Sequence, residues 1–357
     1  MSPGKHVIDP QRLLMRLLRG LLILSATLLG MAAIVPLLWP IPALQDTRSA
    51  AAVAETIADP FARFVDIEGL SIYVEDRGVA GDSRLPLVLL HGFPASTFTW
   101  RELIEPLSHR GRVVAFDRPG FGLSARPLPP EDQENFAEGH DPYSAQSQVR
   151  QTLALMDELD IERAILLGSQ SGGTLALRVA LARPERIAAL ILIAPAIASG
   201  DLPPWLRRLF DTPQLRRIGP LLSRDLRERS EPTIDNASHD RQGLDKQIRL
   251  GTRRTFAVDD WDQALWRYTL AYHSPDELLP RLANLDISTL VITGAGESKI
   301  DRSAPSVPSA PSTSEELAAA LKAAEFVEIA ECGPLPQEEC PAPTLAAIDA
   351  FLQGLRE

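Results

Sequence analysis

The chain has 357 residues, of which 45% are hydrophobic, and a formal net charge of −11. This composition indicates a globular protein with one large domain or two smaller ones, and it excludes a disordered chain. Residues 1–45 carry a net charge of +3, which leaves −14 for the remainder. The larger part therefore lacks the excess of lysine and arginine on which nucleic-acid binding depends, and we expect no nucleic-acid partner.

An uncharged apolar run, residues 20–39, lies near the N-terminus. Twenty helical residues rise about 30 Å, close to the thickness of a bilayer core. The basic residues of this region all precede the run, so residues 1–19 are predicted to be a cytoplasmic tail and the rest of the chain to lie outside. We expect a single-pass anchor over 20–39. The alternatives are a cleaved signal peptide and a buried core helix.

Beyond a linker expected over residues 40–60, strands and helices alternate. Apolar and polar residues alternate over 64–68 and 71–75, which predicts a half-exposed hairpin. Apolar runs predict buried strands, and periodic apolar residues predict helices such as 145–159. This alternation predicts an α/β fold with a doubly wound, mostly parallel sheet and a site at its carboxyl edge. The predicted buried strands are 86–90, 112–116, 164–167, 189–193, 288–292 and 325–330.

Residues 168–172, Gly-Ser-Gln-Ser-Gly, join one of these apolar runs to a helix-forming run. Glycines on both sides let the backbone bend sharply and keep the side chain between them exposed. The segment resembles the nucleophile elbow, G-x-Nu-x-G, of the α/β-hydrolase family. The two glycines, and Pro184 at the end of the following helix, place Gln170 at the nucleophile position. The family has Ser, Cys or Asp there.

Two further motifs follow the order of the same family. Residues 91–94, His-Gly-Phe-Pro, resemble its oxyanion loop. The resemblance implies that the backbone N–H groups of Phe93 and Ser171 face a substrate oxyanion, and that His91 is structural. Residues 117–124 resemble its D-x-P-G-x-G-x-S turn, which is a tight structural turn. The motif order implies an α/β-hydrolase fold in two parts, 61–198 and 283–357, with a helical cap, 199–282, inserted between them.

The acid and base positions also follow from the resemblance. Residues 294–297 resemble the family's G-x-x-D segment, which puts Glu297 at the acid position. Cys332-Gly333-Pro334 and the glutamates after it resemble the segment that carries the catalytic histidine, which puts Pro334 at the base position. No histidine follows His273, so no shift of register supplies the base. A triad needs a nucleophile, a base and an acid, and the first two roles are vacant.

Other side chains are candidates to replace the missing chemistry. Ser169 and Ser171 flank Gln170, but the geometry of an elbow turns both away from the reacting position. Glu297 is a candidate to activate a water molecule directly. His140 and His273 are candidates to enter from a loop or from the cap, although nothing in the sequence brings them to the site.

Cys332 and Cys340 are the only cysteines. In an extracytoplasmic compartment we expect them to form a disulfide, the alternatives being free thiols or a catalytic Cys332. No cluster of histidine, cysteine and carboxylate residues has zinc spacing. We therefore expect no metal and no cofactor. Residues 205–230 carry seven arginines against three acidic residues, and we interpret this excess as a solvated helix face, with contact to an anionic membrane as the alternative.

The sequence thus predicts a membrane-anchored α/β-hydrolase-fold protein with impaired catalysis. We expect it to bind a small apolar molecule or a protein partner, and to contact the membrane through residues 20–39. One alternative is an active, esterase-like hydrolase with a non-standard site. Another is a purely structural or interaction module.

Overall fold

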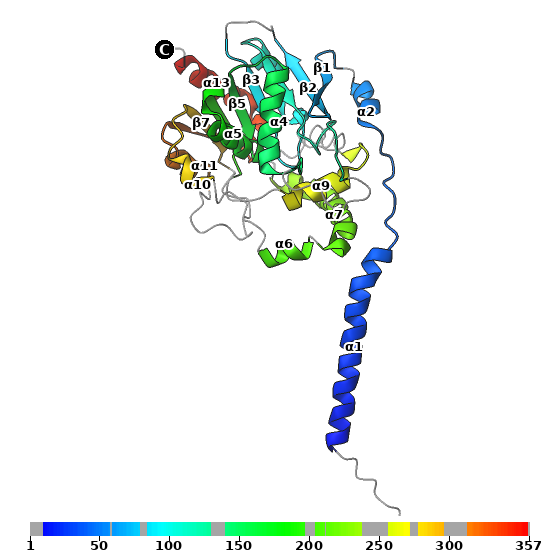
Figure 1. Cartoon of the computed structure of the whole chain (residues 1–357). Coiled ribbons are helices and arrows are strands. Elements are labelled where there is room, and N and C mark those ends of the chain that lie inside the picture. Colours follow the sequence, from blue (N-terminus) through cyan, green and yellow to red (C-terminus); the bar gives the residue numbers. More distant parts are fainter. Residues whose placement is uncertain are drawn as a thin grey trace, which may run out of the picture.

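The computed structural model describes residues 10–57, 59–78, 84–129, 140–196, 204–210, 212–237, 256–271, 278–295 and 313–355. Within these ranges eight strands form a single sheet in the order β1-β2-β4-β3-β5-β6-β7-β8 (Figure 1). The strands are β1 (Ala62–Ile67), β2 (Leu70–Arg77), β3 (Leu87–Leu90), β4 (Val113–Phe116), β5 (Ala164–Ser169), β6 (Ile187–Ile193), β7 (Thr289–Gly294) and β8 (Ala324–Ile329).

The helical elements complete the chain order. They are α1 (Pro10–Leu38), α2 (Ala50–Ile57), η1 (Thr97–Trp100), α3 (Ile104–Ser108), α4 (Ala145–Glu158), α5 (Ser171–Ala182), η2 (Pro184–Arg186), α6 (Pro204–Phe210), α7 (Pro213–Ala237), α9 (Trp261–Ala271), α10 (Leu279–Leu282), α11 (Ser314–Ala320), α12 (Pro336–Glu339) and α13 (Pro341–Gly354).

The sheet is mostly parallel. The hairpin β1–β2 is antiparallel, and its tight turn uses positive φ at Glu68 and Gly69. β2 also pairs antiparallel with β4, whereas β3 to β8 pair in parallel. The parallel strands place their carboxyl ends along one edge of the sheet. The predicted α/β fold with a mostly parallel sheet is confirmed.

Apolar side chains on the two faces of the sheet build two separate cores. Successive residues of a strand point to opposite faces. Val88 and Leu90 pack toward α4, α5 and α11, while Leu87 and Leu89 pack toward α3 and α13. Because both faces are covered, the central strands must be apolar throughout, as the sequence shows.

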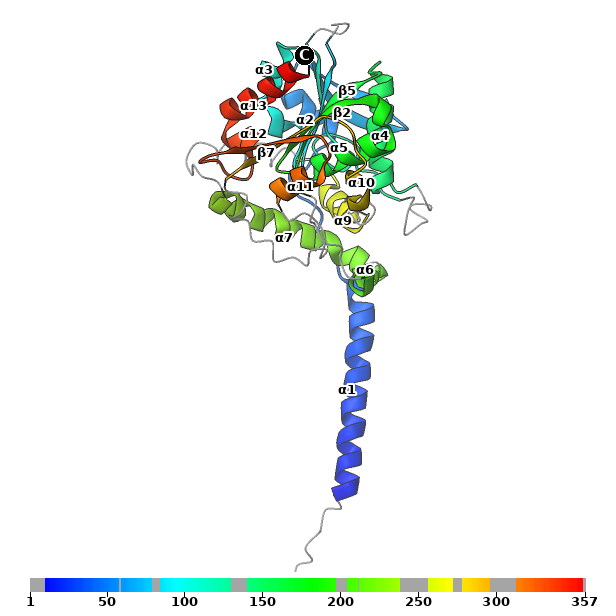
Figure 2. The same cartoon turned by 90° about the vertical axis from the view of Figure 1, so that its left-hand side faces the viewer.

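Between β6 and β7 the described part of the chain forms helices α6, α7, α9 and α10. Helices α6, α7 and α9 lie between the sheet and α1 in Figures 1 and 2. α7 packs against α9 where Gly219 lies against the ring of Trp266. Trp261 and Trp266 are both buried, so they pack this region rather than line an open surface.

Helix α1 begins at Pro10, earlier than the predicted start at residue 20, because the leucine-rich residues before it are also good helix formers. It projects from the domain (Figures 1 and 2). Its segment Leu18–Leu38 is long and apolar enough to cross a membrane, with a mean hydropathy of 2.4 and no residue of that window buried in the protein. It is therefore not a core helix of this domain.

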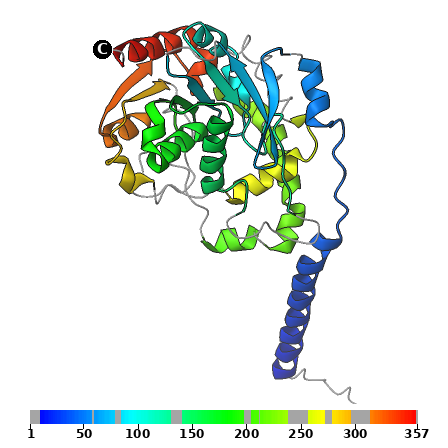
Figure 3. The ribbon, with the colours of Figure 1, turned by 45° about the horizontal axis from the view of Figure 1, so that its top comes forward.

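The segment expected to be a linker contains helix α2 and is bound to the domain. Val53 of α2 packs with Tyr73 and Val258, and Figure 3 shows α2 beside β1 and β2. The backbone of Arg48 pairs with Ala257 and Asp259. From Arg48 onward, this segment is therefore packed on the domain rather than being a free tether.

Candidate functional site

Gln170 is the single residue between β5 and α5. Its backbone has φ 49° and ψ −119°, a region that non-glycine residues rarely adopt. Its N–H donates to the carbonyl of Ile193 at 3.0 Å, and its carbonyl accepts from the N–H of Gly173 at 3.0 Å. These bonds hold a sharp strand-to-helix turn with Gln170 at its apex.

The glycines that flank Gln170 are required by close approach of the backbone. A Cβ on Gly172 would lie against the carbonyl oxygen of Leu90, and one on Gly168 would lie 2.5 Å from the carbonyl oxygen of Gly172. Any side chain at either position would push β3, β5 and α5 apart.

The amide of Gln170 faces the oxyanion loop. Its Oε1 lies 2.6 Å from the position that a Cβ on Gly92 would take. Ser169 and Ser171, in contrast, are 1% and 7% exposed. The apex therefore presents a neutral amide at the position where the family resemblance predicts a nucleophile, and the neighbouring serines are buried.

Arg118 lies beneath this turn and was not singled out by the sequence. It is 1% exposed. Its Nη2 donates to the carbonyl of Gly92 and to Oγ of Ser171, both at 3.1 Å. Its Nη1 donates to Oε1 of Gln148 at 3.0 Å and to the hydroxyl of Tyr268 at 3.3 Å. One guanidinium thus joins the oxyanion loop, the elbow, α4 and α9. The only sequence signal is its place directly after the aspartate that follows β4.

His91 is structural in this arrangement. It is fully buried, its Nδ1–H donates to the carbonyl of Gly92 at 2.8 Å, and its Nε2 accepts from the N–H of Arg118 at 3.0 Å. Burial, and then the charge of Arg118, hold the pKa of His91 well below its usual value. A neutral ring with both nitrogens engaged by the backbone has no free site for a substrate proton.

Asp117 organises the glycine turn that follows β4. Its carboxylate accepts from the N–H of Thr97 at 2.6 Å and from the N–H of Leu123 at 2.7 Å. Burial raises the pKa of Asp117 to about 7, although both hydrogen bonds favour the charged form. Gly122 lies against this carboxylate, which leaves no room there for a side chain.

Pro334 is buried in the loop between β8 and α12. The carbonyl of Gly333, next to it, lies against Gly294 at the end of β7. The N–H of Ala295 donates to the carbonyl of Ile329 at 3.1 Å, which ties the ends of β7 and β8 together. Because β5 to β8 are neighbouring parallel strands, Pro334 lies at the same sheet edge as Gln170.

Glu297, the acid position, and His273 lie outside the described residues. His140 is described and is exposed.

The alpha/beta hydrolase family matches residues 87–347 of the chain. This chain belongs to the alpha/beta hydrolase family. The matched range begins at β3 and ends within α13, so it contains the oxyanion loop, the elbow and the loop that carries Pro334.

Individual relatives resemble the chain to different extents. The uncharacterized hydrolase YugF of Bacillus subtilis (strain 168) is 26% identical over 245 residues, 66% of this chain and 80% of the relative. The dihydrolipoyllysine-residue acetyltransferase component of the acetoin cleaving system of Pseudomonas putida is 38% identical over 118 residues, 33% of this chain and 29% of the relative. The chain therefore spans less than a third of that relative's length.

Among solved structures, a membrane phospholipase A, described as a bacterial virulence factor, superposes with a TM-score of 0.59 at 22% identity. The superposition covers 96% of this chain and 99% of the other. At this level of identity the likeness shows the fold alone.

In this alpha/beta hydrolase the loop of Pro334 is closed by a disulfide between Cys332 and Cys340, which confirms the predicted pairing. Glu338 adds a second link, because its carboxylate accepts from Oγ1 of Thr99 and from Nη1 of Arg101, both at 2.6 Å. Among the described residues, no group of three or more His, Cys, Asp or Glu side chains is arranged to hold a metal ion.

An aromatic cluster lies beside the oxyanion loop. The ring of Phe93 stacks on Tyr268 of α9 with centroids 5.2 Å apart, and Phe121 meets Tyr268 edge-on at 4.7 Å. Both Phe121 and Tyr268 also lie against the guanidinium of Arg118. Helix α9 thereby packs against the oxyanion loop next to the elbow.

Proposed function

We propose that this alpha/beta hydrolase has lost the Ser–His–acid chemistry of its family and acts by binding a small apolar molecule or a protein partner. The observation that carries the proposal is the neutral amide of Gln170 at the apex of an intact elbow. An amide has no nucleophilic atom comparable to an activated hydroxyl or thiol. The elbow, by contrast, keeps the strained backbone and close glycine packing on which such a site is built.

The second support is Pro334 at the base position. Its ring has no titratable group, so it can neither take a proton from a nucleophile nor return one to a leaving group. Loss of triad members typically reduces rates by about 10⁴- to 10⁶-fold. With both positions changed, only binding and oxyanion stabilisation by the N–H groups of Phe93 and Ser171 would remain.

Retained binding is supported by Phe93, whose partly buried ring lies beside the elbow and packs against the buried rings of Phe121 and Tyr268. Aromatic rings next to a few polar groups are typical of sites for small apolar ligands. In this proposal α6, α7 and α9 form the cap that encloses such a ligand.

An active hydrolase with a non-standard site is the second candidate. It is favoured by the preserved oxyanion loop, where His91 and Arg118 still fix the carbonyl of Gly92. In such an enzyme Glu297 would activate a water molecule directly, without a covalent intermediate.

The full-length protein in detergent is expected to hydrolyse short p-nitrophenyl esters no faster than its Gln170→Ala variant, because neither carries a nucleophile. The measurement is the initial rate of p-nitrophenol release at matched protein concentration, with Glu297→Ala as a further variant. A substantial wild-type rate that disappears in Glu297→Ala would refute the loss of chemistry and establish the water-activating alternative.

We also propose that residues 20–39 anchor the protein in the membrane, with the hydrolase domain outside. The anchor is supported by the length and hydropathy of Leu18–Leu38 and by the exposure of that helix. Alkaline carbonate extracts peripheral proteins but not spanning helices, so it should leave this protein in the membrane pellet.

The orientation is tested separately. Protease added to intact cells should cut the domain around Gln170. Protection of the domain while external controls are cut would contradict the orientation, and release by carbonate would contradict the anchor.

A further inference from the structure

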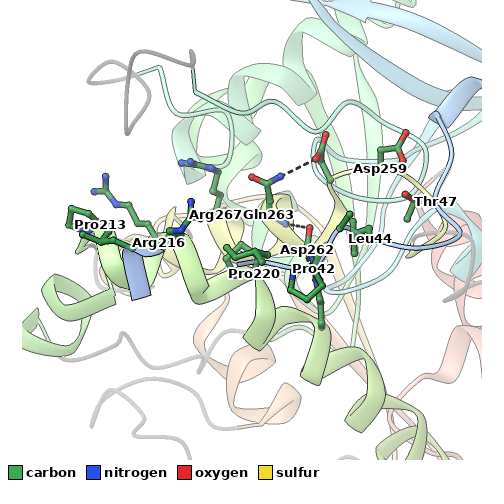
Figure 4. A pocket seen from close by; sticks show the side chains of 16 residues that line it. Pro42, Leu44, Thr47, Pro213, Arg216, Pro220, Asp259, Asp262, Gln263 and Arg267 are labelled. Atoms are coloured by element: carbon green, nitrogen blue, oxygen red, sulfur yellow. Dashed lines mark hydrogen bonds and ion pairs between the residues drawn. The ribbon is translucent and has the colours of Figure 1, made fainter. Parts of the chain in front are cut away.

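A pocket of about 790 Å³ lies where the end of α1 meets the hydrolase domain, away from the elbow (Figure 4). One side is formed by Leu37 and the segment 41–47 that follows α1. The other sides are formed by α7 and by residues 259–267 at the start of α9. None of its lining residues belongs to the elbow, the oxyanion loop or the loop of Pro334.

Some of the charged side chains of the pocket lie at opposite ends of it. Arg216 and Arg267 lie at one end, and Asp259 and Thr47 lie at the other (Figure 4). Burial lowers the pKa of Arg267. Tyr143 and Asp141 oppose this shift, and the nearby charge of Arg216 adds to it. Both guanidinium groups also have interactions within the protein. An anion bound at this end of the pocket would further offset the repulsion between the two arginines.

Most of the remaining charges serve to hold the pocket together. Arg224 donates from Nε to Asp262 and from Nη1 to the carbonyl of Pro42, both at 2.7 Å. Asp260 accepts from Nε2 of Gln263 at 3.0 Å. Among the described residues, no ion pair engages the carboxylate of Asp259, which is exposed at the far end.

The pocket lies at the level where a spanning α1 would leave the bilayer. Gln214 of α7 donates to the carbonyl of Ala33, and Arg217 donates to the carbonyl of Trp39. These carbonyls are about 9 Å apart along a helix axis, so α7 runs beside the last turns of the apolar helix. α6 lies at the level of the same end in both views (Figures 1 and 2), and its Trp205 and Leu209 are 67% and 46% exposed. Exposed Trp and Leu side chains at this level are typical of a helix that contacts the membrane–water interface.

We propose that this pocket binds the headgroup of a zwitterionic phospholipid from the adjacent leaflet. Arg216 and Arg267 would hold the phosphate, because guanidinium groups pair with phosphate through parallel hydrogen bonds. The headgroup amine would face Asp259, and the glycerol end would contact the apolar side formed by Leu37 and Ile41. This inference rests on the proposed membrane anchor and is independent of the state of the triad.

The test uses full-length protein, delipidated in detergent and then titrated with lipid in mixed micelles. The midpoint of thermal unfolding, followed by tryptophan fluorescence, reports binding. Phosphatidylethanolamine should raise the midpoint and should bind more tightly than phosphatidylglycerol. Soluble glycerophosphoethanolamine and inorganic phosphate should raise it little at the same concentration, because they lack the contacts of the glycerol and acyl region.

Variants separate the two ends of the pocket. Arg216→Gln with Arg267→Gln should weaken binding of both lipids at least about tenfold, since two charge-assisted contacts to phosphate are lost. Asp259→Asn should remove only the preference for phosphatidylethanolamine. Arg183→Gln, an exposed arginine outside the pocket, is the matched control and should behave as the wild type. If the double variant does not fold, Arg267→Lys alone should still weaken binding, because it keeps the charge but loses the paired geometry.

Three results would overturn the inference. One is that lipid does not raise the unfolding midpoint, although carbonate leaves the protein in the membrane. In that case the proposed anchor would still stand. Another is that lipid still raises the unfolding midpoint fully after the arginine substitutions, or that the preference for phosphatidylethanolamine remains in Asp259→Asn. The third is that glycerophosphoethanolamine or phosphate alone raises the unfolding midpoint as much as the lipid does. That result would assign the pocket to a soluble phosphate compound. Release by carbonate would instead remove the anchor itself and, with it, the basis for a lipid.

Discussion

Replacing Gln170 by Ser and Pro334 by His in one protein is expected to create measurable esterase activity. The serine would take the apex of an elbow whose backbone is already in place, with φ 49° at that position. The histidine would stand at the same sheet edge, on the loop beside the end of β7. Since two intact triad roles are worth several orders of magnitude, partial geometry should still raise the rate on the order of 100-fold over the wild type.

The single variants are the matched controls for this experiment. Gln170→Ser alone should gain little because no base removes its proton, and Pro334→His alone should gain little because it has no nucleophile to activate. Glu297→Ala in the double variant should lower the new activity if Glu297 orients the histidine. An inactive double variant whose unfolding midpoint matches that of the wild type would show that the site no longer has triad geometry.

Replacing Gly172 by Ala is expected to destabilise the protein severely, by on the order of 3 kcal/mol. The new Cβ would lie against the carbonyl oxygen of Leu90 and close to that of His91. Both obstacles are backbone atoms of β3 and the oxyanion loop, so no side-chain rotation relieves the overlap. The measurement is the free energy of unfolding of full-length protein in detergent, from denaturant titration followed by circular dichroism.

Gly354→Ala provides the control for the change in residue type. Gly354 lies in the last turn of α13, and no described atom other than its chain neighbours and the backbone of that helix lies within 4 Å of the position that its Cβ would take. Alanine there should be neutral or stabilising by less than about 1 kcal/mol, because it favours the helix more than glycine does. If Gly172→Ala were equally mild, the elbow would not be packed against β3 as described.

Much of the fold could be predicted because its determinants lie within a few residues of each other. The alternation over residues 64–68 and 71–75 encodes the hairpin, and the buried strands appear as short apolar runs. The placement of Gln170 at a sharp turn follows from an apolar run, two glycines and a helix-forming run in sequence. In each case the backbone conformation is set by local steric limits and by which side chains are buried. Both can be inferred from a single stretch of sequence.

The early start of α1 and helix α2 were not predicted, for related reasons. Residues 10–19 combine charges with leucines, so they carry no uniform apolar signal, yet they continue the same helix. Residues 50–57 are alanine-rich and weakly patterned, and their helix is stabilised by packing of Val53 on Tyr73 and Val258. Packing against distant segments decides such weakly encoded elements.

The sequence by itself determined the family motifs, the neutral residues at the nucleophile and base positions, and the apolar helix near the N-terminus. Only the tertiary structure decided that Arg118 is buried beneath the elbow, where its four partners come from four different segments. It also decided that Arg216, Asp259 and Arg267 line one pocket beside the end of α1. The reason is that the burial and pairing of a charged side chain depend on the groups that surround it in space. Those groups come from distant parts of the chain, so the local sequence does not reveal them.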